Sequence, residues 1–163
     1  MRSGHGLFTG RPIKDIAIEI IDEEIIVTGD HVNQGYMNGI GDAENKLKRS
    51  DDIWHRTGDA GHLDPQGNLW LRGRLSAKAG AFHPFEVEVA ARQWDGVVQA
   101  ALVPNSLPPR LALTGQEPKD GAWKKQAQQF GELKVIKLGT LPMDKRHRSK
   151  IDYTALRQID LSS

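Results

Sequence analysis

The chain has 163 residues, and its 22 basic and 21 acidic side chains leave a formal net charge of +1 at pH 7. This balance gives no electrostatic reason to expect a nucleic acid or a membrane surface as the partner. The absence of cysteine excludes disulfide bonds and thiolate metal sites. No apolar run approaches the length of a membrane span, and residues 1–12 lack the apolar core of a secretory signal, so we expect a cytoplasmic globular protein of one domain or two small ones.

The first half of the chain is predicted to be mostly β-structure. Four short apolar segments are predicted as strands: 15–21, 24–28, 61–64 and 68–72. The first two are separated only by Asp22-Glu23 and the last two by Pro65-Gln66-Gly67, so each pair is expected to form a hairpin. The polar segment 38–52, with its two glycines and scattered charges, is predicted to be a loop.

The pattern changes after Arg74. A helix is expected from Pro84, whose ring suits a first helical turn, to about Trp94. Its apolar stripe is Val87, Ala90, Ala91 and Trp94. The expected elements that follow are a strand over 97–103, a break over 104–110, a strand over 111–114, a helix over 119–130, a strand over 133–138, a basic loop over 140–150 and a helical turn over 154–158. This order is typical of a small α+β domain, and the boundary with the β-rich part falls near residues 74–80.

A series of glycine-containing motifs carries a family resemblance. Trp54-His55-Arg56-Thr57-Gly58-Asp59 is followed by Gly61, Gly67 and Gly73-Arg74. Further matching segments are Gly10-Arg11-Pro12, residues 24–29, Gly35-Tyr36-Met37-Asn38, residues 84–88, and Leu141-Pro142 with Lys150. A single Thr-Gly-Asp is a weak signal, but the ordered series covers nearly the whole chain. The sequence therefore resembles the carboxyl-terminal third of the adenylate-forming superfamily, the AMP-binding synthetases and ligases.

The resemblance implies a division of the chain and an activity. Residues 1–74 would be the β-rich end of the large amino-terminal domain, and residues 75–163 would be the mobile α+β lid. The complete enzyme would activate a carboxylic acid with ATP and Mg²⁺ as an acyl-AMP and would pass the acyl group on, with CoA as one acceptor. The phosphate loop and acyl-pocket segments of the family have no counterpart in this sequence, so we expect the chain to be inactive alone.

Two residues are candidates for holding the nucleotide. The Asp59 carboxylate can accept hydrogen bonds from two vicinal ribose hydroxyls, which is the role that the resemblance implies. Its structural alternative is a turn aspartate, which is common after glycine. Arg74 carries a fixed fork of donors that suits ribose and phosphate oxygens. Its alternative is a solvated arginine at the end of a strand.

Lys150 is the candidate catalytic residue. During adenylation a carboxylate attacks the α-phosphorus of ATP and pyrophosphate leaves, so an ammonium group can offset the negative charge that develops. The resemblance implies that the lid brings Lys150 to this place. Locally the residue belongs to a basic run with Lys145, Arg146 and Arg148, and such runs are usually solvated. A contact with the phosphates of ATP or CoA is the minor alternative for the other three.

The remaining aromatic and imidazole side chains are given structural roles. Trp54 is predicted to be a packing residue, with an adenosine contact as the minor alternative. The histidines show no metal-ligand spacing and are predicted to be surface or turn residues; they are His5, His31, His55, His62, His83 and His147. No glycine-rich phosphate cradle is present, and Gly39-Ile40-Gly41 is interpreted as a flexible loop.

The sequence departs from the family pattern at two further places. Ser76 stands where the usual hinge has Asp or Lys, and the stretch from Arg74 to the next helix is about four residues short, which weakens the case for CoA as acceptor. The lysine loop, residues 142–151, is similar to that of β-lactone synthetases and neighbouring fatty-acyl ligases. A fatty acyl substrate is therefore expected, while CoA, another acyl acceptor and ring closure to a lactone stay open. Two other functions also stay open: a non-catalytic nucleotide-binding module, and one half of a split enzyme whose other polypeptide supplies the phosphate loop.

Overall fold

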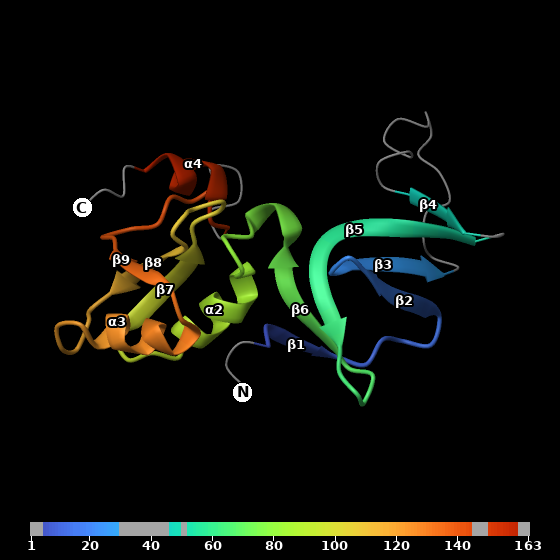
Figure 1. The fold of residues 1–163 in the computed structure, drawn as a ribbon, viewed down its shortest axis with the longest axis horizontal. Helices are drawn as coiled ribbons and strands as arrows, with labels where there is room; N and C mark the ends of the chain where they lie inside the picture. The colour runs from blue at the N-terminus through green and yellow to red at the C-terminus, as the bar shows by residue number, and fades with distance from the viewer. Residues whose placement is uncertain (1–4, 30–45, 50–51, 145–149, 160–163) are drawn as a thin grey trace.

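Two β-sheets lie side by side in the protein, with one helix between them (Figure 1). The computed structural model describes residues 5–29, 46–49, 52–144 and 150–159. The first sheet is antiparallel and has six strands: β1 (Leu7–Gly10), β2 (Ile16–Ile21), β3 (Glu24–Gly29), β4 (Lys46–Arg49), β5 (Asp52–Leu63) and β6 (Leu69–Arg74). Its order is β1-β6-β5-β3-β2, and β4 pairs with β5. This mixture of sheets and short helices confirms the predicted α+β class.

Both predicted hairpins are present. Strands β2 and β3 pair from Ile16 opposite Gly29 to Ile21 opposite Glu24. Their two-residue turn uses positive φ angles at Asp22 (49°) and Glu23 (69°), the conformation that matches the twist of paired strands. The turn therefore forms without the glycine that usually favours it. Strands β5 and β6 form the second hairpin around Asp64, whose carboxylate accepts the backbone N–H groups of Gln66 and Asn68.

The predicted loop over 38–52 is wrong where the structure describes it. Residues 46–49 form strand β4, which pairs with the first residues of β5, and Asp52 already belongs to β5. Leu47 is the sole apolar residue of β4, so no alternation marked it as a strand. The pairing with β5 rests on backbone hydrogen bonds, and the ion pair between Arg49 and Glu19 connects β4 to β2. Strand β1 was also not predicted.

The second sheet and its helices follow the predicted order. The elements are α2 (Pro84–Ala91), β7 (Val97–Leu102), β8 (Arg110–Gly115), α3 (Ala122–Ala127), β9 (Lys134–Lys137) and α4 (Tyr153–Gln158). Strand β8 is central, antiparallel to β7 and parallel to β9. Helix α2 ends at Ala91, earlier than predicted, because residues 92–94 continue as turns. The predicted helix over 119–130 is α3 followed by the 3-10 helix η2 (Gln128–Phe130).

Two apolar clusters cover the two faces of this sheet. Helices α2 and α3 pack on one face with Val87 and Trp123, together with Trp94, which follows α2, and α4 packs on the other face with Leu156. Alternation along β8 explains the division, because Leu111 and Leu113 belong to the first cluster and Ala112 to the second. The second unit is therefore a three-layer arrangement with β7 at one edge. In the part of the chain that the structure describes, no helix is long and apolar enough to cross a membrane.

Glu23 joins the two units at the turn between β2 and β3. Its carboxylate accepts hydrogen bonds from Arg72 Nη1 and Lys78 Nζ, both at 2.8 Å. The hydrogen bond from Lys78 is the main cause that holds the pKa of Glu23 below its ordinary value. Arg72 also donates from Nε to Glu86 of α2 at 2.7 Å. Since Lys78 lies in the connection and Glu86 in α2, this network ties the first sheet to the start of the second unit.

Candidate functional site

A bulge in β5 displays the Thr57-Gly58-Asp59 motif. Ile26 pairs with Arg56 and Glu24 with Ala60, so the three motif residues lie opposite the single residue Ile25. Gly58 adopts a φ of +71°, which an L-residue rarely takes. A side chain there would also place a Cβ 3.2 Å from Nη1 of Arg74. The extra residues bend the strand, as Figure 1 shows for β5, and leave Asp59 without a partner in the β3–β5 register, although it pairs with Arg74 of β6.

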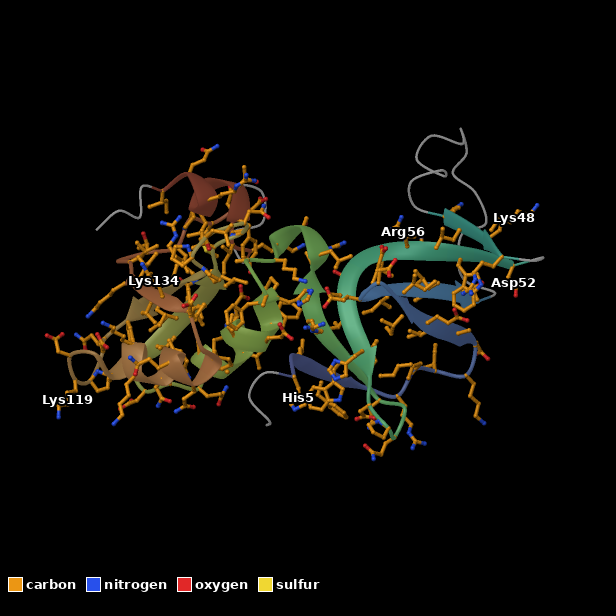
Figure 2. All side chains as sticks on the ribbon, in the orientation of Figure 1. His5, Lys48, Asp52, Arg56, Lys119 and Lys134 are labelled. Atoms are coloured by element: carbon orange, nitrogen blue, oxygen red, sulfur yellow. The ribbon has the colours of Figure 1, made fainter. Side chains whose placement is uncertain are left out.

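Buried groups of β3 hold the motif in place. The carboxylate of Glu24, only 7% exposed, accepts Gly58 N at 3.0 Å and two donors of Arg56, Nε at 2.8 Å and Nη2 at 2.5 Å. Thr57 donates its hydroxyl to the Ile25 carbonyl at 2.7 Å and accepts Asp59 N at 3.1 Å. In Figure 2 Arg56 lies on the curved strand β5, on the side of the molecule opposite Lys119 and Lys134. The motif backbone is thus held by hydrogen bonds to β3, and the Asp59 carboxylate stays partly exposed.

The structure brings two of the three candidate residues together. Asp59 lies directly opposite Arg74 in the β5–β6 register, and Nε of Arg74 is 3.1 Å from Oδ1 of Asp59. Arg74 also donates from Nη1 to the Thr57 carbonyl at 2.8 Å. Both side chains stay accessible, 33% for Asp59 and 64% for Arg74. An accessible carboxylate acceptor and an accessible guanidinium donor therefore lie side by side, where one ligand could contact both.

The Gly-Arg sequence has a steric explanation. Gly73 has a φ of +110°, and a Cβ there would lie 3.0 Å from the ring of Pro84. Glycine thus lets β6 approach the first turn of α2 closely. This contact sets the direction in which the chain leaves the first sheet at Arg74.

Lys150 lies on a different segment. It lies between β9 and α4, three residues before α4 begins, and its carbonyl accepts the N–H of Asp144 at 2.8 Å. An isolated bridge between Met143 and Ile151 and the bond from Asp152 N to the Pro142 carbonyl complete a short ladder at the base of this loop. The Lys150 side chain is exposed. Within the described residues no ion pair joins it to Asp59.

A cavity of about 370 Å³ connects the neighbourhood of Arg74 with the segment that follows Lys150. Arg74, the connection to α2, the first turn of α2 and the loop after β7 form one part of its wall. Tyr153, Thr154 and Arg157 of α4 form another part. Among the described residues that line it are two guanidinium groups and no carboxylate, and Phe85 and the prolines make much of the lining apolar. The cavity therefore suits an anionic ligand that also has an apolar part.

Trp54 and the histidines can be compared with their predictions. Trp54 is 8% exposed and packs in the first sheet, as expected. His83, in contrast, was predicted to be a surface or turn residue and is completely buried. It precedes α2, where Glu86 accepts its backbone N–H at 2.8 Å and its Nδ1 lies 3.3 Å from the same carboxylate. His83 caps α2 at a packed interface, and the spacing of the histidines in the sequence does not indicate such a role.

Several predicted features lie outside the described residues. They are His31, His147, Gly35-Tyr36-Met37-Asn38, Gly39-Ile40-Gly41, Lys145, Arg146 and Arg148. Among the residues that are described, no group of three or more His, Cys, Asp or Glu side chains could hold a metal ion. We therefore assign no described residue to Mg²⁺.

Sequence reasoning missed most of the residues that support the site. Glu24, Arg56 and Thr57 were part of quoted motifs, but their mutual contacts depend on the bulge in β5. Glu88 and Tyr153 were also given no separate role, although the Tyr153 hydroxyl donates to the buried Glu88 carboxylate. These two residues are far apart in sequence, so spacing alone held no signal for their contact.

Several curated relatives of the chain are named as CoA ligases. Over 109 residues it is 35% identical to 2-succinylbenzoate--CoA ligase of Enterococcus faecalis, an alignment that covers 58% of this chain and 22% of that protein. It is 37% identical over 100 residues to 3-[(3aS,4S,7aS)-7a-methyl-1,5-dioxo-octahydro-1H-inden-4-yl]propanoyl:CoA ligase of Mycobacterium tuberculosis, with 58% of this chain and 19% of that protein covered. The chain thus spans about a fifth of the length of these relatives. No family model matches it.

Solved structures share the fold over nearly the whole chain. O-succinylbenzoate coenzyme A synthetase of Bacillus subtilis in complex with AMP superposes with a TM-score of 0.71 at 23% identity, covering 94% of this chain and 35% of that one. The amide bond synthetase of Marinactinospora thermotolerans gives a TM-score of 0.71 at 22% identity, covering 92% and 36%. Together with the curated relatives, these neighbours confirm the resemblance drawn from the sequence.

Proposed function

The chain matches the carboxyl-terminal part of the adenylate-forming enzymes, and from this premise we propose that it supplies the ribose-binding residues and the lid of an ATP-dependent, acid-activating ligase. The observation that carries the proposal is the pair formed by Asp59 and Arg74, which are 3.1 Å apart and both accessible. The pair lies near a cavity whose other wall is α4, just after Lys150. Residues 1–74 would then close the nucleotide site from one side, and residues 75–163 would form the lid.

The proposed chemistry uses the charges of these three residues. The Asp59 carboxylate accepts hydrogen bonds from the ribose hydroxyls of ATP. Arg74 holds the Asp59 carboxylate in place through the contact of its Nε with Oδ1, and its remaining donors reach ribose or phosphate oxygens. The Lys150 ammonium approaches the α-phosphate and the attacking carboxylate and offsets the negative charge that grows in the transition state. The products of this step are acyl-AMP and pyrophosphate, and Mg²⁺ accompanies the phosphates of ATP.

The proposed substrate is a carboxylic acid. The relatives include ligases named for succinylbenzoate and for a propanoyl-bearing ring system, and both names specify CoA as the acceptor. CoA is therefore the acceptor that we propose first for this protein. A fatty acyl chain rests only on the lysine loop and stays a prediction, as do the two open alternatives for the acceptor and the cytoplasmic location.

The reaction also requires surfaces beyond this chain. The solved neighbours are about three times as long, since the chain covers 35% of one and 36% of another. We propose that the phosphate loop and the acyl pocket come from the region that these neighbours have in addition, whether on the same polypeptide or on a separate one. The binding module and the split enzyme both use the same Asp59–Arg74 pair.

The proposed catalytic step is tested by ATP–pyrophosphate exchange in the assembled enzyme. Exchange should require a carboxylic acid and should fall by several orders of magnitude in Lys150→Ala. Lys134→Ala, which removes an exposed lysine of β9, is the matched control. Equal exchange in Lys150→Ala and in the control would remove Lys150 from the catalytic role.

A further inference from the structure

A buried carboxylate connects the three layers of the second unit. Glu88 lies on α2, is 2% exposed, and accepts the N–H of Leu102 on β7 at 2.8 Å. The same carboxylate accepts the hydroxyl of Tyr153, the first residue of α4, with distances of 3.0 and 3.2 Å to its two oxygens. Helix α4 packs on the face of the sheet opposite α2. Tyr153 therefore reaches around the edge strand β7 to meet Glu88.

The position of this contact is unusual for a charged group. An edge strand leaves outward N–H groups without a strand partner, and Glu88 satisfies the one at Leu102. Burial raises the pKa of Glu88, and burial together with the nearby Glu88 charge raises the pKa of Tyr153. Burying an ionisable carboxyl group beside an edge strand destabilises the fold more than burying an uncharged side chain there would. The presence of Glu88 at this place, in contact with Tyr153 of α4, therefore points to a role beyond packing.

The segment that carries Lys150 leads directly into α4. Only two residues separate Lys150 from Tyr153, and Asp152 caps α4 by accepting Ala155 N at 2.9 Å. Two backbone hydrogen bonds join this segment to the chain that follows β9. Asp144 N donates to the Lys150 carbonyl, and Asp152 N donates to the Pro142 carbonyl. Because Asp152 immediately precedes Tyr153, a movement of Tyr153 would disturb these two backbone hydrogen bonds. Tyr153 also lines the cavity that Arg74 borders.

We propose that Tyr153 and Glu88 are positioning residues, which hold the Lys150 segment in register across the cavity from Arg74. Neither side chain touches the reacting atoms in this account. The hydrogen bond between them fixes the start of α4 and, through it, the backbone of Lys150. The inference rests on the proposed role of Lys150.

The first arm of the test measures this anchoring without any ligand. Tyr153→Phe removes only the hydroxyl, and Glu88→Gln keeps an oxygen that can accept both hydrogen bonds. Hydrogen exchange at the amides of Asp144 and Asp152 should become faster by roughly tenfold or more in Tyr153→Phe, the size expected for a lost hydrogen bond to a carboxylate. Glu88→Gln should stay close to the original protein. Ser106→Ala is the matched control, because it removes another buried hydroxyl that donates to the Val103 carbonyl at 2.8 Å in the same unit.

The second arm is a double-mutant cycle on the binding of decanoyl-sulfamoyl-adenosine, a non-hydrolysable mimic of acyl-AMP. If Tyr153 acts through Lys150, Tyr153→Phe weakens binding in the original chain and has no further effect in Lys150→Ala. A merely structural role would give the same loss in both backgrounds. An additive cycle, or unchanged exchange at Asp144 and Asp152 in Tyr153→Phe, would overturn the inference. Binding that survives Asp59→Ala would instead contradict the proposed function, and the exchange arm would still decide whether Tyr153 anchors the segment.

Discussion

Asp59 and Arg74 face each other across strands β5 and β6, with 3.1 Å between the carboxylate Oδ1 and the guanidinium Nε. The β5–β6 hairpin brings them together although 14 residues lie between them in the sequence. The hairpin register, the bulge at Gly58 and the close approach at Gly73 all contribute to this pairing. The pairing of Asp59 with Arg74 therefore depends on the first sheet and on its contact with the first turn of α2.

The ion pairs of Glu23 predict how the two units are held together. Glu23→Gln removes the charge that Lys78 and Arg72 share, and we expect a loss of about 1 kcal/mol in the free energy of unfolding, since partly exposed networks contribute amounts of this size. Urea unfolding at low salt measures it. The difference from the original protein should shrink in 1 M NaCl because salt screens accessible charges.

Glu19→Gln is the control for this prediction. It also removes a carboxylate from an ion pair, but its partner Arg49 belongs to the same sheet. Because the chain has no cysteine, spin labels at Ile13→Cys and Val98→Cys, both exposed positions, report the distance between the units. Glu23→Gln should broaden this distance distribution and Glu19→Gln should leave it unchanged. Equal distributions would show that Glu23 does not hold the units together.

Gly73→Ala tests the steric account of the Gly-Arg motif. The substitution forces an L-residue into a φ of +110° and places its methyl group 3.0 Å from the Pro84 ring. We expect a loss of roughly 2 to 4 kcal/mol, measured by urea unfolding, because strain and overlap add. Gly67→Ala is the matched control, since Gly67 also has a positive φ (+78°) but an added Cβ meets open space. If the free energy of unfolding falls no further than in the control, the contact between the new methyl group and Pro84 does not destabilise the fold, and the steric account is wrong.

Asp64 predicts a pH dependence of stability. The hydrogen bond from the Asn68 side chain is the largest of the causes that lower the pKa of Asp64 from 3.8 to about 2 in the folded chain. A carboxyl group whose pKa is lower in the folded state stabilises the fold above its unfolded pKa, and this contribution is lost as the pH falls toward the folded pKa. Asp64→Asn should therefore lower the melting temperature at pH 6, and the difference should shrink steadily as the pH falls and be largely lost by about pH 2.

Thermal unfolding between pH 2 and pH 6 measures this effect. Asp120→Asn, which changes an exposed aspartate in the loop before α3, serves as the control and should leave the profile unchanged. A constant difference between Asp64→Asn and the original protein across the whole range would contradict the proposed origin of the effect.

Local patterns predicted much of the fold. Apolar alternation over 16–21 and the Asp-Pro-Gln-Gly turn identified both hairpins, and the break after Val103 separated β7 from β8. Strand β4 was not predicted because its pairing with β5 relies on backbone bonds, which leave no apolar pattern in four residues. The end of α2 was misplaced because Trp94 continues the apolar stripe although the helix has already ended.

The candidate site divides in the same way. Asp59, Arg74 and Lys150 were predicted as candidates because they belong to motifs with fixed spacing. Their supports were not, since Glu24 acts through a bulge and Glu88 meets Tyr153 around a sheet edge. Such contacts depend on how whole elements pack, and no local sequence pattern encodes that.

The most direct test of the account is calorimetric titration of this chain with decanoyl-sulfamoyl-adenosine, using the original sequence, Asp59→Ala and Asp120→Ala. If Asp59 and Arg74 form a ribose site, the original chain and Asp120→Ala bind the mimic with equal affinity, and Asp59→Ala binds at least tenfold more weakly, as loss of hydrogen bonds to a charged group requires. Equal affinity in all three proteins would contradict a ribose role for Asp59, and no binding by the original chain would contradict a ribose site that this chain assembles without the additional region.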